Sequence, residues 1–380
     1  MSNSVFIHAH NIISPLGVTS EANFDNVLQG KTGIQKQLNI AIDDAELHAS
    51  LIDDNSFLHF INEQNNFTRF ETLAIASIQQ SLKEATIDVS SEKTIFILST
   101  TKGNIALLEN NEVNTELYKR ISLFHSAKLI AQHFNNQNTP VVISNACISG
   151  IAAIIYAKRM LENGVYENAV VVGADTISKF VYSGFKSFHA LCKGICKPFS
   201  FDRDGINLGE AAATIILSTS SQSQNKIMIK AGVIGNDANH LSGPSKTGEE
   251  LSLAINKSLE KAQLSSDEID FISAHGTATP YNDEMEAKAF HLSNLNVVPV
   301  NSLKGNFGHT LGAAGLLETI MSIISLRENV ILPTYGFTKI GVPVDITICE
   351  KPIKKVMRAF IKTASGFGGC HAAAVFEQIN

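Results

Sequence analysis

One cysteine of this 380-residue chain lies where a nucleophile could be generated. The stretch VVISNACISG (141–150) starts as a short apolar strand and continues beyond Cys147 as an apolar helical run. A helix N-terminus has free N–H groups and a partial positive charge, which favour a thiolate and can bind an oxyanion. A core cysteine packed like an alanine would explain the same stretch, because free cysteine is among the most buried residue types. The surrounding chain must decide between these alternatives.

Three other loops follow buried apolar strands and carry residues that could act beside a thiol. AHGTATP contains His275, NSLKGNFGHTLGAAG contains Lys304 and His309, and SGFGGCHAA contains Phe367 between glycines. Ligands of α/β folds collect at the carboxyl ends of strands. Taken alone, either histidine is most simply explained as a loop residue whose ring is hydrogen-bonded and has no catalytic role. The loops together predict a site formed by Cys147, both histidines, Lys304 and the glycine loop around Phe367.

The second half of the chain repeats the first in outline. Residues 297–329 contain a short apolar strand, a glycine-rich turn and an Ala/Gly-rich apolar helix, as the cysteine region does. In this repeat His309 takes the place of Cys147. Because the strands are apolar throughout, we expect them to be buried on both faces. The pattern predicts an α/β fold with layered α/β/α/β/α packing of two duplicated halves.

The polar stretch STSSQSQN (218–225) indicates a linker between these halves. We therefore predict an N-terminal half, 1–222, that carries the nucleophile, and a C-terminal half, 223–380, that carries the two histidines. Residues 183–210 are predicted to be mostly loop.

Composition narrows the classes of protein. With 44% hydrophobic and 17% charged residues the chain is typical of a globular protein, and its net charge of −6 argues against nucleic acid as a partner. The start lacks a signal-peptide pattern, and no run approaches the ~18 apolar residues of a membrane span. The five cysteines form no disulfide framework, and the pair at 192 and 196 lacks a matching second pair of ligands. We expect a cytoplasmic protein with reduced thiols, no metal and no membrane contact.

The motifs together resemble the β-ketoacyl-acyl-carrier-protein synthases, the condensing enzymes of type II fatty acid and polyketide synthesis. The resemblance covers nearly the whole chain and rests on ISPLG, NACISG, FDRDGINLGEAAA, HGTATPYND, NSLKGNFGHTLGAAGLLE and GFGG, in the family's order. It implies a thiolase-like five-layer fold and no cofactor. It also implies an acyl carrier protein as partner, and a homodimer or a heterodimer with a chain-length partner subunit.

The resemblance assigns roles to individual residues. Cys147 corresponds to the nucleophile that accepts the acyl chain as a thioester. His275 and His309 correspond to the pair that polarises the malonyl thioester carbonyl, which suits neutral imidazoles facing a developing enolate. Lys304 and Glu318 resemble the charged pair that supports the second of these histidines.

A second oxyanion forms when the acyl thioester is attacked. The backbone N–H groups of Cys147 and Phe367 are the candidate donors, and Phe367 resembles the family's gating residue. Gly366, Gly368 and Gly369 allow this backbone to approach closely.

Two positions depart from the family pattern. Ser365 stands where the terminal loop commonly has an aromatic residue, and Cys370 permits a thiolase interpretation, although it follows the glycines and a packing role is favoured. Lys102 stands where fatty-acid synthases usually have a small or apolar residue of the acyl tunnel. We expect Lys102 to pair with a carboxylate such as Glu109 or an acid of a partner chain; the alternative is that it narrows or polarises the tunnel and selects rigid, conjugated or aryl acyl chains.

Carrier docking needs basic surface residues, because carrier proteins of this family are acidic. For Arg203 a buried ion pair with Asp202 or Asp204 is the simpler explanation. The candidates are Arg69, Lys186, Lys193 and Arg203.

Four functions compete. A non-catalytic chain-length partner would lack the cysteine, a degradative thiolase would have its second cysteine before the glycines, and a cysteine hydrolase would need one histidine with an orienting Asn or Asp. The sequence therefore favours a synthase that condenses malonyl-carrier with a cysteine-bound acyl chain. The loop STTKGN resembles synthases of aryl polyene pathways.

Overall fold

The computed structural model describes residues 3–37, 47–56, 67–221, 226–238, 243 and 245–379. The predicted boundary at residue 222 lies outside these ranges.

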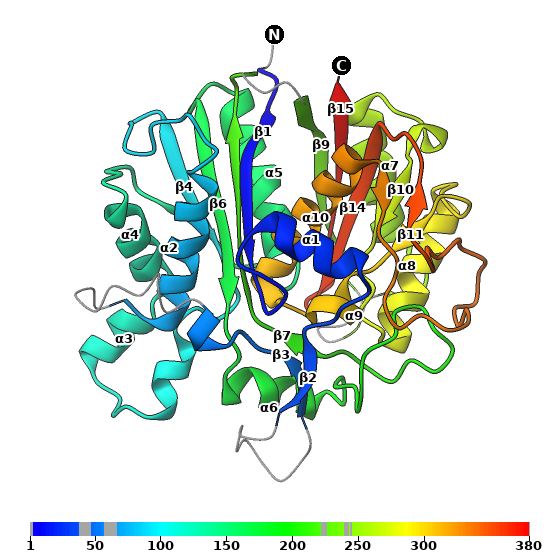
Figure 1. Ribbon diagram of the computed structural model, residues 1–380, viewed down its shortest axis with the longest axis horizontal. Helices are drawn as coiled ribbons and strands as arrows, with labels where there is room; N and C mark the ends of the chain where they lie inside the picture. Colours follow the sequence, from blue (N-terminus) through cyan, green and yellow to red (C-terminus); the bar gives the residue numbers. More distant parts are fainter. Residues whose placement is uncertain are drawn as a thin grey trace.

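A 10-stranded sheet is built from two parts with the same topology (Figure 1). The parts touch where β1 pairs with β9 at one position, Phe6 with Met228. In both parts the strand order is third, second, fourth, fifth, first along the chain, and the first three of these strands are parallel. The first part contains β1 (Phe6–Ile13), β4 (Thr94–Ser99), β5 (Val141–Ile143), β6 (Asn168–Asp175) and β8 (Ala211–Ser218). The second contains β9 (Lys226–Asn236), β10 (Phe271–Ser273), β11 (Val300–Asn301), β14 (Ala359–Gly366) and β15 (Cys370–Ile379).

Helices cover both faces of each part. α2 (Arg69–Ser81) and α4 (Leu123–His133) pack on the outer face of the first part, and α7 (Glu249–Ala262) and α8 (Pro280–Leu292) on that of the second. α5 (Ser149–Glu162) and α10 (Ala314–Glu328) form the middle layer. The predicted five-layer arrangement of duplicated halves is confirmed.

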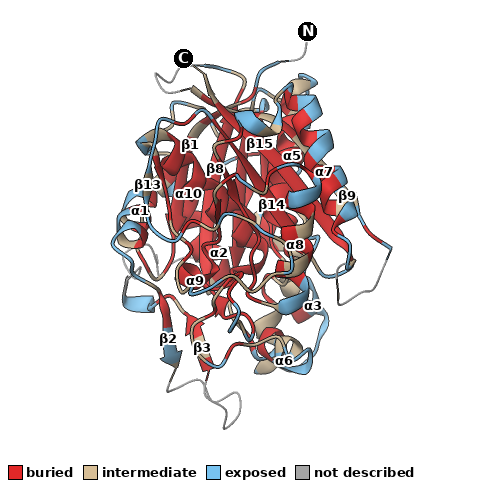
Figure 2. Cartoon of the chain, turned by 90° about the vertical axis from the view of Figure 1, so that its right-hand side faces the viewer, coloured by how far each residue is buried: buried red, intermediate tan, exposed pale blue. Residues whose placement is uncertain are grey.

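The middle layer is the apolar centre of the molecule (Figure 2). β8 is buried along its whole length, as expected for a strand covered on both faces. α5 and α10 approach closely through small residues: a Cβ on Gly150 would lie 2.7 Å from the backbone nitrogen of Leu316, and one on Gly315 would lie 2.6 Å from that of Ile151. Larger side chains would therefore separate the helices that follow Cys147 and His309.

The remaining elements are short and lie mainly around the carboxyl ends of the strands. The expectation that 183–210 is mostly loop is confirmed, except that the helix α6 (Lys179–Ser187) extends into its first residues. No described helix has the length and apolar character of a membrane span. These elements are α1 (Ser20–Leu28), β2 (Ile34–Gln37), β3 (Leu47–Ser50), α3 (Thr115–Ile121), α6 (Lys179–Ser187), β7 (Leu208–Gly209), α9 (Lys304–Phe307), β12 (Val330–Ile331) and β13 (Ile353–Lys354).

Candidate active site

The structure brings the cysteine and both histidines together. Cys147 follows β5, His275 follows β10, and His309 lies between α9 and α10. The sulfur and one ring nitrogen from each histidine lie within 4.8 Å of one another. The two imidazoles are edge to face, with ring centroids 5.3 Å apart. The duplicated topology thus places the turns of the two halves against each other.

Cys147 lies on a strained turn just before α5. The preceding residue, Ala146, has φ = +43°, which non-glycine residues rarely adopt. Burial raises the pKa of the Cys147 thiol to about 12, with Lys304 and the Phe367 N–H opposing the shift. Cys147 is therefore a neutral thiol before substrate binds, in spite of its position at a helix start.

Both histidines are neutral donors. Burial lowers the pKa of His275 and of His309 well below 6.5, and the positive charge of Lys304 lowers both further. Neither ring nitrogen of His309 has a hydrogen-bond partner among the described residues. One nitrogen of a neutral imidazole carries a proton, so His309 can donate to a bound carbonyl oxygen.

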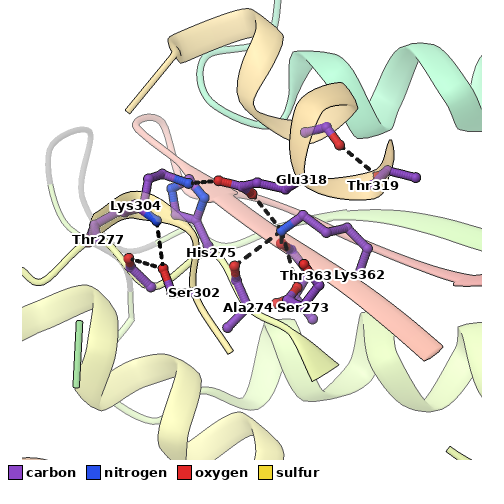
Figure 3. A network of polar contacts seen from close by, with 12 residues as sticks. Ser273, Ala274, His275, Thr277, Ser302, Lys304, Glu318, Thr319, Lys362 and Thr363 are labelled. Atoms are coloured by element: carbon purple, nitrogen blue, oxygen red, sulfur yellow. Dashed lines mark hydrogen bonds and ion pairs between the residues drawn. The ribbon is translucent and has the colours of Figure 1, made fainter. Parts of the chain in front are cut away.

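Lys304 and Glu318 form the predicted charged pair. Lys304 is fully buried, and its Nζ contacts Glu318 Oε1 (Figure 3). The sequence did not single out a second buried lysine, Lys362 on β14, whose Nζ lies 2.8 Å from Glu318 Oε2. β14 is buried from Ala359 to Ser365, and such a strand gives no sequence signal for a buried lysine.

Two further carboxylates hold the loops of the site. Glu286 accepts the backbone N–H groups of His275 at 2.9 Å and Gly276 at 2.6 Å. Asp175 accepts the backbone N–H groups of Thr101 at 2.9 Å and Gly312 at 2.7 Å. Sequence reasoning missed both. An acidic residue that ends the apolar strand β6 was an available signal for Asp175.

The glycine loop approaches the nucleophile closely. A Cβ on Gly366 would lie 2.9 Å from both the Cys147 nitrogen and the Cys370 sulfur. Gly368 has φ = +88°, where other residues are strained. Cys370 is buried, and its thiol contacts the carbonyl oxygen of Phe367 at 3.5 Å. These contacts agree with a packing role for Cys370.

A cavity of about 330 Å³ opens beside Cys147. Its wall is largely aromatic, with Phe180 and Phe185 from α6 and Phe367 from the glycine loop. Lys102 also lines it, with Nζ 5.9 Å from the centroid of the Phe180 ring. The expected pair with Glu109 is wrong, since Glu109 accepts the backbone N–H of Lys179 and no described carboxylate pairs with Lys102.

Arg203 is not a surface residue. Its side chain is 5% exposed and lies 3.3 Å from Glu284 and 3.9 Å from Asp283. The expectation of a buried ion pair is confirmed, but the expected partners, Asp202 and Asp204, are wrong. Arg203 therefore cannot serve as a docking residue for a carrier protein.

The other docking candidates differ in exposure and in their ion pairs. Arg69 pairs with Asp54 at 2.6 Å and with the buried Glu210 at 2.9 Å, so its charge is already neutralised. Lys186 and Lys193 are exposed. The basic surface for a carrier protein is thus reduced to these two lysines among the predicted residues.

The cysteine and the two histidines also have the donor types of a zinc site. However, Lys304 and Lys362 share the single carboxylate of Glu318 and leave a net positive charge beside the histidines, which opposes a divalent cation. The surroundings fit a thiol nucleophile with two N–H donors better than a metal centre.

Comparison with known proteins gives a consistent assignment. Residues 2–223 match the family described as "Beta-ketoacyl synthase, N-terminal domain", and residues 227–338 match the C-terminal domain of the same family. The 3-oxoacyl-[acyl-carrier-protein] synthase 2 of Vibrio harveyi is 26% identical over 99% of this chain and 98% of its own. That of Staphylococcus aureus is 26% identical over 98% of both chains.

Solved structures show the same fold. The complex of the ketosynthase ApeO with its chain length factor ApeC from Xenorhabdus doucetiae matches with a TM-score of 0.88 at 25% identity, over 99% of this chain and 98% of that one. The ishigamide ketosynthase/chain length factor matches with a TM-score of 0.90 at 22% identity, over 100% of both chains.

The layered fold and the Cys–His–His site define a condensing enzyme of the thiolase-like class. The chain belongs to the β-ketoacyl synthase family. The enzymes of this family are acyltransferases, and the condensing-enzyme prediction is confirmed.

Proposed function

We propose that the protein transfers an acyl chain to Cys147 and condenses it with malonyl-acyl carrier protein, releasing carbon dioxide. One observation carries this proposal: Cys147, His275 and His309 converge within 4.8 Å, with both imidazoles neutral, and Cys147 lines the adjacent cavity. A single thiol and two N–H donors are what the two half-reactions need.

In the first half-reaction the Cys147 sulfur attacks the thioester of an acyl-carrier. Its proton leaves as the C–S bond forms, because the resting group is a thiol, and a histidine nitrogen within 4.8 Å can accept it. The tetrahedral oxyanion receives the backbone N–H groups of Cys147 and Phe367. The carrier thiolate then departs, takes up the proton and leaves the chain as a Cys147 thioester.

In the second half-reaction the malonyl thioester oxygen accepts hydrogen bonds from His275 and His309. Loss of carbon dioxide places negative charge on that oxygen, which the two donors stabilise more strongly than the ground-state carbonyl. The enolate carbon attacks the Cys147 thioester, and the sulfur leaves and regains a proton. The product is a β-ketoacyl-carrier extended by two carbons.

The carrier protein and a second subunit are partners in this proposal. Lys186 and Lys193 offer positive charge to an acidic carrier near the α6 face of the site. β5 is an edge strand of its sheet, and no described strand pairs with its outer side, which could take a second copy or a chain-length partner subunit. The related ketosynthase ApeO forms a complex with its chain length factor, ApeC.

Two alternatives are less well supported. A chain-length partner would not need Cys147 and both histidines, whereas this chain has all three in contact range. A degradative thiolase would use its second cysteine as acid and base, whereas Cys370 packs against the glycine loop. For the pathway, the aromatic wall and Lys102 favour an aryl polyene or polyketide chain over a saturated fatty acyl chain.

The proposal is tested by reconstitution. Acyl-carrier and malonyl-carrier are incubated with the enzyme, and carrier-bound products are weighed by mass spectrometry. The wild-type protein should form β-ketoacyl-carrier, and Cys147→Ala should form none. Release of free acyl acid without extension would indicate a hydrolase, and equal turnover of acetyl-coenzyme A pairs would indicate a thiolase.

A further inference from the structure

Lys362 is the most deeply buried cation of the site apart from Lys304. It lies on β14, is fully buried and makes an ion pair with Glu318 Oε2 at 2.8 Å (Figure 3). Its ammonium also donates to the carbonyl oxygens of Ser273 at 3.1 Å and Ala274 at 3.2 Å, and to that of Thr363. The group is thus fully partnered, although burying an ammonium is costly.

The partners of Lys362 converge on one catalytic residue. Ser273 ends β10, and Ala274 directly precedes His275. Glu318 lies on α10, the helix that follows His309. Lys362 therefore links the end of β10, which His275 follows, with α10, which follows His309.

We propose that Lys362 is a positioning residue for the decarboxylation half-reaction: its ammonium clamps the carbonyl groups before His275 to Glu318 and fixes the two imidazoles as a pair. Lys362 acts through His275 and Glu318 and does not touch substrate. Cys147 acylation relies on the backbone N–H groups of the other loops for its oxyanion and needs a histidine only as a proton acceptor, so this role affects decarboxylation far more than acylation. The inference rests on the proposed function.

The charges near His275 and His309 support the same role for Lys362. Lys304 and Lys362 share Glu318, so these three groups together carry one positive charge. Glu286 accepts the backbone N–H of His275 at 2.9 Å, and His371 on β15 pairs with Asp237 at 3.1 Å. The charge of Lys362 lowers the pKa of both His275 and His309, after the larger effects of burial and Lys304. Lys362 thus helps to keep both imidazoles neutral.

The test compares Lys362→Met with Lys230→Met. Lys230 lies on β9 and also pairs with a buried carboxylate, Glu377, at 3.0 Å, but it makes no contact with the described site residues. Lys362→Met should slow malonyl-carrier decarboxylation by on the order of tenfold to a hundredfold, which corresponds to losing hydrogen bonds to a charged group. Acylation of Cys147, followed as intact-protein mass, should stay within about twofold. Lys230→Met should leave both rates unchanged.

A spectroscopic readout separates positioning from general weakening of the fold. In the NMR titration of the imidazoles, Lys362→Met should raise the pKa of His275 and His309, because a positive charge has been removed. If Lys362→Met unfolds, Lys362→Gln replaces it, since the amide keeps donors for the two carbonyl groups and lacks the charge.

The outcomes are distinguishable. A folded Lys362 variant with wild-type decarboxylation and unshifted histidines would overturn the inference. Equal loss of both half-reactions would also overturn it, because that result indicates a structural role alone. A wild-type enzyme that decarboxylates no malonyl-carrier would instead refute the proposed function.

Discussion

Replacing Lys102 by isoleucine tests how the cavity selects its acyl chain. Lys102 is half-buried in the wall of the cavity and is anchored by its backbone N–H, which Asp175 accepts at 3.2 Å. Its ammonium lies over the ring of Phe180 in the cavity wall, and no described carboxylate pairs with it. The variant therefore removes a charge next to the acyl chain while the backbone stays fixed.

The structure sets the size of the effect. Cation–π contacts contribute about 0.5–1 kcal/mol when exposed and about 2 kcal/mol when desolvated. The 5.9 Å separation from Phe180 is near the outer limit of such contacts, and Phe180 itself is partly exposed. An acyl chain with a conjugated or aryl end should gain a similar amount from Lys102. Lys102→Ile should thus shift the ratio of kcat/KM for saturated over aryl acyl-carriers upward by about twofold to fivefold.

The assay measures condensation with a panel of medium-chain saturated, conjugated and aryl-ended acyl-carriers at a fixed malonyl-carrier concentration. Lys179→Ile is the matched control, because Lys179 is an exposed lysine of the same α6 face and does not line the cavity. An unchanged preference in a folded Lys102→Ile protein would refute selection by Lys102 and leave it a structural role.

Two other predictions concern stability. Gly150→Ala should lower the free energy of unfolding by about 1–3 kcal/mol, because its Cβ would meet backbone atoms of α10 at 2.7 Å, whereas Gly184→Ala, with nothing within 4 Å, should be neutral or stabilising; urea titration measures both. Burial lowers the pKa of His10 to about 4, so the unfolded chain binds a proton below pH 6.5 that the folded chain refuses. Stability should therefore fall as the pH drops from 6.5 to 4, by about 3 kcal/mol more in wild type than in His10→Gln, and equal pH slopes for the two proteins would contradict this.

The layered fold was accessible from the sequence because local patterns determined it. Strands without polar residues predict sheets covered on both faces, and the repeated order of strand, glycine turn and apolar helix predicts two equivalent halves. The same pattern placed Cys147 and His309 in matching turns. The helix α6 was missed, although its N-cap residue Ser178 was an available signal. Its Phe180 and Phe185 line the cavity, and Phe185 also packs against a small core cluster.

Buried charges were the least predictable part. Lys362 lies in a strand whose other residues are uncharged, and only the fold shows that Glu318 reaches it. Arg203 stands beside Asp202 and Asp204 in sequence, yet it pairs with residues of α8, because the chain folds that helix over it. We expected the helix start to lower the pKa of the Cys147 thiol. Burial raises this pKa instead, and its effect exceeds that of the helix.

The most direct measurement of the central claim compares His309→Ala with Cys147→Ala in separate assays of the two half-reactions. His309→Ala should lose malonyl-carrier decarboxylation by about a hundredfold or more, as expected for removal of an oxyanion donor, and should still accept an acyl chain on Cys147. Cys147→Ala should lose acylation and condensation completely and retain slow decarboxylation. Near wild-type decarboxylation by His309→Ala, or acylation of Cys147→Ala at another cysteine with continued condensation, would contradict the account.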